Sequence, residues 1–354
     1  MDNTIFKVVD SSSKDEWNKI VKSFDNWDIY YLFEYANSFS LHGDGEPLLI
    51  YFQDGDNRFC FPIMKKDISN YYMFENKLEK NKYFDASTPY GYGGPLAKGS
   101  FSKESQEIYI KELEKYCLEN NIISLFFRFH PLFNNQEVIK DVTNIQYVHD
   151  TIYMDLESEE VINTNLDSKN RNMIRKAIKN DVSIVVKPIT DYKDFMIVYA
   201  ETMEKLKATK YYKFSEEYFK YLKDMNDNAC IFYAMYNDKP IAGSIILYNE
   251  KYMHYHLSGT IQEYRNLPAT NLLLFEAAKW GSNKGIKKFH LGGGLSQDDS
   301  LFGFKKQFNK NDRIGFYIGS NIFNKEAYDY LMNFRKEIEP EFDMNNSNLI
   351  QYRK

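Results

Sequence analysis

The sequence has 354 residues, of which 43% are hydrophobic and 27% are charged, and its formal net charge is −5 at pH 7. These values are typical of a folded chain of two domains and argue against an intrinsically disordered protein. The acidic balance also argues against DNA binding and against general RNA binding, although it leaves room for one local basic strip.

The first half of the chain alternates between expected strands and expected helices. Period-two patterns and turn residues predict strands at 5–9, 123–131 and 145–156, and a hairpin at 46–64 around the turn Asp-Gly-Asp-Asn. Helical patterns cover 11–24, 31–41 and 103–120. A loop rich in glycine and proline is expected at 84–99.

The second half repeats this order. We expect helices at 159–180, 192–209, 215–225, 268–283, 301–308 and 325–337. Strands are expected at 182–189, at 287–294 and 313–320, and as three antiparallel strands within 229–260. The repeat predicts two α+β domains, 1–155 and 156–354, with mixed, mainly antiparallel sheets. The segment 320–354 could pack back on the first domain.

The order in the second half has a structural consequence. The last of three meandering strands is followed by a helix and then by one more strand, so these two strands should run parallel. In a mixed sheet such neighbours can diverge and leave a slot, where a bound ligand supplies partners for the backbone. We therefore expect a binding cleft between them.

Several classes of chemistry are excluded by missing motifs. The sequence has no GxSxG, GxxxxGK[ST] or GxGxxG motif, which argues against a serine hydrolase, a P-loop NTPase and a dinucleotide-binding protein. Cys60, Cys117 and Cys230 are far apart, so we expect reduced thiols and no bound metal. Without an apolar leader or an 18-residue apolar run, a cytoplasmic protein with no transmembrane segment is expected.

Five segments carry a resemblance to a known family. They are TPYGYGGPL at 88–96, FFRFHPLFNN at 126–135, RNMIRKAIKNDVSIVV at 171–186, the stretch from 256 to 294 that ends in FHLGGG, and DSLFGFKKQF at 299–308. In this order they resemble the Fem family of FemAB-like transferases. That family includes peptidoglycan bridge-forming aminoacyltransferases and related N-acyltransferases. The resemblance implies tandem GNAT-like domains.

The resemblance places the catalytic centre at Phe304 and Lys305, because a matching Phe-Lys pair lies at the active site of the family. A fixed cation there would stabilise the oxyanion that forms during amide synthesis. Lys306 is the neighbouring candidate, and the alternative is a solvated lysine on an amphipathic helix. The segment 34–43 lacks the lysine that contacts a diphosphate in some family members, which argues against a diphosphate-linked peptidoglycan acceptor.

Candidate binding residues surround this pair. In the segment EYRNLPATN, at the position of the CoA pyrophosphate site of GNAT enzymes, Tyr264, Arg265 and Asn271 are candidates. Pro268 and Thr270 replace the usual glycines there, so either CoA binds differently or the donor is not CoA; a plain helix start is the other interpretation.

The first half supplies further candidates. Tyr90, Gly91 and Tyr92 lie in the glycine-rich loop, where a substrate can approach the backbone, and Arg128 follows in FFRFHP. An ordered loop without a binding role is the alternative.

Two other patterns remain open. His254 and His256 fall on one expected strand with period two, so His256 could bind substrate or one of the pair could act as general base, while packed core histidines are the alternative. The expected helix 159–180 places Arg171, Arg175 and Lys179 on one face. This face could bind the phosphates of tRNA or of a diphosphate-linked lipid, or it could be an ordinary solvent-exposed helix face.

These observations predict a transferase that moves an acyl or aminoacyl group to an amine of a cell-envelope or sugar precursor. The co-substrate would be acyl-CoA or aminoacyl-tRNA, with no tightly bound cofactor. Partners would be a small-molecule, lipid-linked or nucleotide-linked precursor and, in the aminoacyl case, tRNA; a peripheral membrane contact is compatible with them. The alternative is a non-catalytic binding protein with a GNAT fold.

Overall fold

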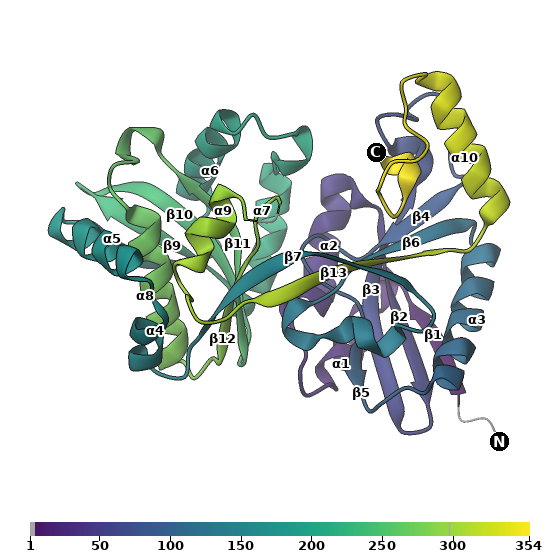
Figure 1. The fold of residues 1–354 in the computed structure, drawn as a ribbon, viewed down its shortest axis with the longest axis horizontal. Helices are drawn as coiled ribbons and strands as arrows, with labels where there is room; N and C mark the ends of the chain where they lie inside the picture. Colours follow the sequence, from purple (N-terminus) through teal and green to yellow (C-terminus); the bar gives the residue numbers. More distant parts are fainter. Residues whose placement is uncertain (1–3, 297) are drawn as a thin grey trace. The chain divides into compact units, whose positions relative to one another are not determined.

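The computed structural model describes residues 4–296 and 298–354 (Figure 1). By their contacts, the residues divide into two units: Met1–Val148 with Phe316–Lys354, and His149–Gly315. The second unit ends before the C-terminal segment, which groups with the first unit; this is the arrangement given above as the alternative for 320–354. No helix in the described residues is long and apolar enough to cross a lipid bilayer.

The first unit is a mixed sheet with helices packed on it. Its helices are α1 (Lys14–Lys22), α2 (Phe33–Phe39), α3 (Lys103–Glu119) and α10 (Lys325–Ile338). Its strands follow the order β1 (Thr4–Val9), β2 (Glu46–Asp54), β3 (Asn57–Asp67), β4 (Phe84–Ser87), β6 (Ile122–Arg128) and β13 (Ile314–Ile322), with β5 (Leu96–Lys98) paired to β3. Because β4 and β5 lie inside 84–99, the expected loop there was only partly right.

The second unit has the same kind of architecture. Its strands follow the order β7 (Asn144–Asp155), β12 (Lys288–Gly292), β11 (Tyr252–Thr260), β10 (Lys239–Tyr248), β9 (Ala229–Tyr236) and β8 (Ser183–Pro188). Its helices are α4 (Glu159–Asn165), α5 (Ser168–Lys179), α6 (Lys193–Lys205), α7 (Glu216–Leu222), α8 (Ala269–Asn283) and α9 (Ser300–Lys306). The predicted α+β class with mixed, mainly antiparallel sheets is therefore confirmed.

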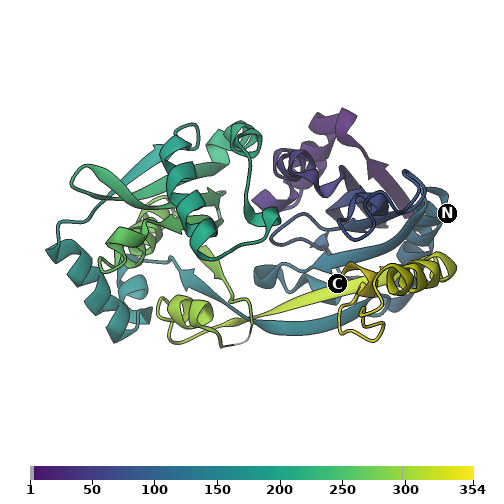
Figure 2. The ribbon, with the colours of Figure 1, turned by 90° about the horizontal axis from the view of Figure 1, so that it is seen from above.

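Two layers of helices cover the sheet of the second unit (Figure 2). Ala242 of β10 belongs to the core cluster beneath α8. The next residue, Gly243, faces the ring of Phe195 in α6, since a Cβ built on it would lie 3.1 Å from that ring. Successive side chains of a strand point to opposite faces, so α8 and α6 lie on opposite sides of the sheet.

The single helix expected at 159–180 is wrong, because the chain breaks between α4 and α5. The Asp167 carboxylate accepts the Lys169 amide at 2.7 Å and starts a new helix. The Arg171 guanidinium donates to the carbonyl oxygens of Leu166 at 2.7 Å and Asn163 at 3.3 Å. The first arginine of the expected basic face therefore caps α4 and is less available to a phosphate.

A buried ion pair fixes the C-terminus to the first unit. Arg353 donates from Nε to Oδ2 of Asp85 at 2.7 Å, and the hydroxyls of Tyr71 and Tyr352 donate to the same carboxylate at 3.0 and 3.1 Å. Asp85 is 1% exposed, so its charge depends on these partners.

We expect Arg353→Met to lower the free energy of unfolding of the first unit by about 3 kcal/mol, because it leaves a buried carboxylate without its cation. Urea denaturation of the whole protein measures this change. Lys325→Met removes an exposed ion pair with Asp329 and is the control, with an expected loss below about 1 kcal/mol. Equal losses in the two variants would contradict this role for Arg353.

Candidate active site

The parallel strands β11 and β12 pair over only three positions. These are Tyr252 with Lys288, Met253 with Phe289 and His254 with His290. Beyond them, β11 stays paired with β10 as far as Thr260, while β12 pairs with β7 as far as Gly292. The expected divergence of these strands is therefore observed, and we call the point where they part the fork.

A β-bulge in β11 explains why the fork starts where it does. Ile245 of β10 is opposite Leu257, and the next residue, Ile246, is opposite Tyr255, so His256 is an extra residue in the ladder. A bulge bends its strand and increases the local twist. Because it comes two residues after the last β11–β12 pair at His254, it turns β11 away from β12.

Lys305 reaches both sides of the fork from the last turn of α9. Its side chain is 8% exposed, and Nζ donates a hydrogen bond to Gly293 O at 2.7 Å. The same Nζ lies 5.8 Å from the centroid of the Tyr255 ring. Gly293 directly follows β12, and Tyr255 is the first residue of β11 past the paired segment, so the ammonium lies at the fork.

The two glycines after β12 allow close packing on two elements: Gly293 lies against β7 and Gly294 against the start of α9. A Cβ on Gly293 would lie 2.4 Å from the His149 ring, and one on Gly294 would lie 2.1 Å from the Asp299 carboxylate. That carboxylate caps α9 by accepting the amide of Phe302 at 2.7 Å, and it also accepts the Leu295 amide at 2.6 Å. The motifs FHLGGG and DSLFGFKKQF therefore fold into one site, which the sequence did not reveal.

Burial changes the protonation of Lys305. Removal from water lowers the pKa of this lysine to about 8, and the Asp299 carboxylate opposes the change. The side chain therefore remains mostly cationic at pH 7. An ammonium has three donors, and within the described residues Gly293 O accepts one of them. The others can point to a bound carbonyl oxygen.

The bulge residue His256 is held in its neutral form. Its Nε2 lies 2.7 Å from the hydroxyl oxygen of Tyr218 in α7. Burial, with a smaller contribution from His254, lowers the pKa of His256 to about 3. An imidazole with this pKa is a weak proton acceptor, which argues against His256 as the general base. His254 has a different neighbour, the His290 ring at 6.0 Å.

The other candidates of the second unit lie on two elements. Phe304 shares α9 with Lys305 and packs its half-buried ring 5.4 Å from Phe308, whereas Lys306 is exposed. At the start of α8, Tyr264 packs 5.9 Å from Tyr236, and Arg265 is exposed.

The start of α8 is partly occupied by internal hydrogen bonds. Asn271 is buried and donates from Nδ2 to Asn170 Oδ1 at 2.8 Å. The Ala269 amide already donates to Leu267 O at 2.7 Å, and Pro268 has no amide hydrogen to donate. This helix start therefore offers few donors to a phosphate.

Three candidates of the first unit, Tyr90, Gly91 and Tyr92, share one loop, and the fourth, Arg128, ends β6. Tyr35 donates its hydroxyl to Tyr90 O at 2.7 Å, and the Tyr92 ring packs 5.6 Å from Tyr30. Gly91 has a φ of +86°, and a Cβ there would lie 2.7 Å from the Tyr30 ring, so this position requires glycine. Arg128 stacks its guanidinium 5.0 Å from the Phe126 ring centroid.

A buried pair beside this loop was missed by the sequence analysis. His130 Nε2 lies 2.8 Å from Asp28 Oδ2, and both side chains are fully buried. The His130 ring packs 5.9 Å from the Tyr92 ring, so the pair supports the loop from within the first unit. The residues are 102 apart in the chain, and no local pattern connects them.

Comparison with known proteins agrees with this geometry. The model of the acetyltransferase (GNAT) domain family matches residues 168–306, which include the fork and Lys305. No curated protein matches the chain. Residues 168–306 of the second unit therefore resemble an acetyltransferase (GNAT) domain.

Solved structures resemble the whole chain in fold. FemX is 12% identical with a TM-score of 0.66, covering 92% of this chain and 99% of FemX. L-PGS from Bacillus licheniformis is 12% identical with a TM-score of 0.55, covering 92% and 96%. A C-terminal domain assigned to a lysylphosphatidylglycerol synthetase of Agrobacterium fabrum is 10% identical with a TM-score of 0.55, covering 92% and 97%. The Fem-like GNAT fold implied by the sequence is thereby confirmed.

The lowered pKa of Lys305 predicts a pH-dependent stability. Between pH 8 and about pH 10.4 the unfolded chain binds more protons at this lysine than the folded chain does, so the free energy of unfolding gains a contribution that rises with pH. We expect the rise to reach about 3 kcal/mol in the wild type relative to Lys305→Met, measured by urea unfolding at several pH values. Lys310→Met alters an exposed lysine and should keep the rise. Parallel pH profiles for wild type and Lys305→Met would refute the shift.

His256 should resist protonation in the folded protein. We expect its imidazole resonances, assigned by comparison with His256→Gln, to stay in the neutral form from pH 8 down to pH 5, because burial disfavours the cation. In the unfolded chain the same ring should titrate near pH 6.5. A midpoint near pH 6 in the folded protein would be inconsistent with this environment.

Proposed function

We propose that the second unit transfers an acyl group from an acyl-CoA thioester to an amine, in the cytoplasm. The observation that carries this proposal is the position of Lys305, whose ammonium contacts Gly293 O and faces the Tyr255 ring where β11 and β12 part. The acetyltransferase domain match over residues 168–306 supports the reaction class. It also supports an acyl-CoA donor.

In this proposal the donor lies in the fork. Past His254 and His290 the two strands no longer pair with each other, so their facing edges can hydrogen-bond to the donor. The amine attacks the thioester carbonyl, and Lys305 donates a hydrogen bond to the oxyanion that forms. Collapse of this intermediate breaks the carbon–sulfur bond and expels the thiolate of CoA, and the proton that the nitrogen loses passes to this thiolate, so the products are the amide and the free CoA thiol.

Burial makes Lys305 suited to this role. A cation taken out of water interacts more strongly with a developing negative charge than a solvated one does. The same burial lowers the pKa of Lys305 to about 8, so the positive charge that strengthens its hydrogen bond to the oxyanion is lost as pH rises through this value. Transfer should therefore weaken above pH 8.

Two alternatives named in the sequence analysis have weaker support than the acyl-CoA donor: an aminoacyl-tRNA donor, and a cell-envelope or sugar precursor as acceptor. An aminoacyl-tRNA donor has no support from the domain match, and Arg171 of the basic helix is engaged in capping α4. A cell-envelope or sugar precursor as acceptor, lipid-linked or nucleotide-linked, follows from the resemblance to the Fem family. Fold similarity to FemX and to a lysylphosphatidylglycerol synthetase domain is compatible with it.

We expect Lys305→Met to lower kcat for acyl transfer by about 100-fold to 1,000-fold, the usual effect of removing one oxyanion donor. The assay measures release of the free CoA thiol from acetyl-CoA with a panel of amino sugars, amino acids and simple amines. Charged tRNA is tested as a second donor.

Substitutions of two other lysines provide the control variants for this experiment. Lys310→Met removes an exposed cation from the segment after α9 and should leave kcat within about twofold. Lys306→Met tests the neighbouring exposed candidate and should change KM more than kcat. A larger loss of kcat in Lys306→Met than in Lys305→Met would overturn the assignment. Consumption of neither donor with any acceptor would favour a non-catalytic binding protein.

A further inference from the structure

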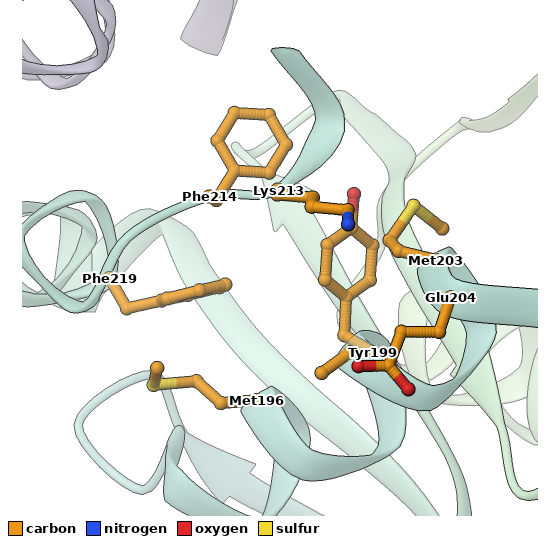
Figure 3. A pocket seen from close by; sticks show the side chains of 8 residues that line it. Met196, Tyr199, Met203, Glu204, Lys213, Phe214 and Phe219 are labelled. Carbon is orange, nitrogen blue, oxygen red and sulfur yellow. The ribbon is translucent and has the colours of Figure 1, made fainter. Parts of the chain in front are cut away.

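An apolar cavity of about 140 Å³ lies between α6 and α7 in the second unit (Figure 3). Met196, Tyr199 and Met203 of α6 line it, together with Phe214 and Phe219. Figure 3 shows these five side chains around a common space. Neither α9 nor Lys305 lines this cavity, so it is distinct from the fork.

The size of the cavity limits what it can hold. An apolar cavity of about 150 Å³ in another protein stays dry and binds benzene. A space of about 140 Å³ with three aromatic rings and two thioethers therefore suits one phenyl ring or a branched aliphatic chain of similar volume. Methionine side chains adapt to either shape.

Opposite charges stand at the exposed side of the cavity. Glu204 and Lys213 are both exposed lining residues, and Figure 3 shows them beside the Tyr199 ring. Neither side chain is in an ion pair within the part of the chain that the structure describes. A carboxylate favours an ammonium and an ammonium favours a carboxylate, so a zwitterionic head group would satisfy both.

A chain of aromatic contacts leads from the cavity to the bulge. The ring of Phe214 stacks on Tyr218 at a centroid distance of 4.2 Å. Tyr218 in turn contacts His256, the bulge residue beside the fork, at 2.7 Å. A ligand in the cavity therefore lies against the same aromatic layer that fixes β11 at the fork.

We infer that the cavity between α6 and α7 binds the apolar side chain of a free α-amino acid. Its ammonium lies near Glu204 and its carboxylate near Lys213. The inference goes beyond the proposed function: it gives the second unit a ligand site apart from the fork. The binding itself requires no donor, so it is tested separately from transfer.

Calorimetry on the full chain provides the test, with L-phenylalanine, L-leucine, phenethylamine, 3-phenylpropanoate and glycine as ligands. L-phenylalanine and L-leucine should bind, phenethylamine and 3-phenylpropanoate should each bind about threefold more weakly than L-phenylalanine, and glycine should not bind. Glu204→Gln should weaken L-phenylalanine and phenethylamine and leave 3-phenylpropanoate unchanged.

Two substitutions on α6 form a matched pair. Ala200→Phe adds a ring at a lining position and should weaken L-phenylalanine at least about tenfold by filling the space. Ile197→Phe adds bulk at a residue that is 65% exposed and is not a lining residue, so affinity should not change. Circular dichroism confirms that both variants fold.

The outcomes separate this inference from the proposed function. Binding retained in Lys305→Met, together with loss of transfer, supports both. Binding of L-phenylalanine without transfer in any assay supports the cavity and removes the acyltransferase proposal. Failure of L-phenylalanine and L-leucine to bind, or equal affinities in Ala200→Phe and wild type, would overturn the inference.

Discussion

The candidate site depends on one hydrogen bond, from the Lys305 ammonium to Gly293 O at 2.7 Å. It joins the end of α9 to the residue that follows β12, and so places a buried cation where β12 and β11 have stopped pairing. The bulge at His256 opens this space, and Gly294 lets the start of α9 approach it. Without the bulge, continued pairing of the strands would leave no open edge for a donor.

The burial of Lys305 lowers the stability of the folded state but serves the proposed reaction. Burial of Lys305 lowers its pKa to about 8, which means that the folded state disfavours the charged form that the proposed chemistry needs. Such a group is usually retained for activity, since an apolar residue at the same position would avoid the desolvation. The hydrogen bond to Gly293 and the nearby Asp299 offset part of this penalty.

Local patterns were sufficient to predict most of the fold. Turn residues located the strands β9, β10 and β11, and the strand–helix–strand order predicted the parallel pair. The break at Leu166 was missed because Arg171 caps the end of α4 and Asp167 starts α5 through hydrogen bonds that the 3.6-residue pattern does not show. The site was only partly predictable: the Fem resemblance singled out Lys305, while its contact with Gly293 depends on tertiary packing. The bulge also could not be foreseen, since a one-residue register change leaves no local signature.

The central claim is that the donor carbonyl lies beside Lys305, and carbon-13 NMR of acetyl-CoA labelled at the thioester carbonyl tests it most directly. A hydrogen bond from a buried ammonium polarises the carbonyl and moves its carbon resonance downfield. We expect this shift on binding to the wild type, its loss as pH rises through about 8, and its absence in Lys305→Met. An identical bound resonance in wild type and Lys305→Met would contradict the account.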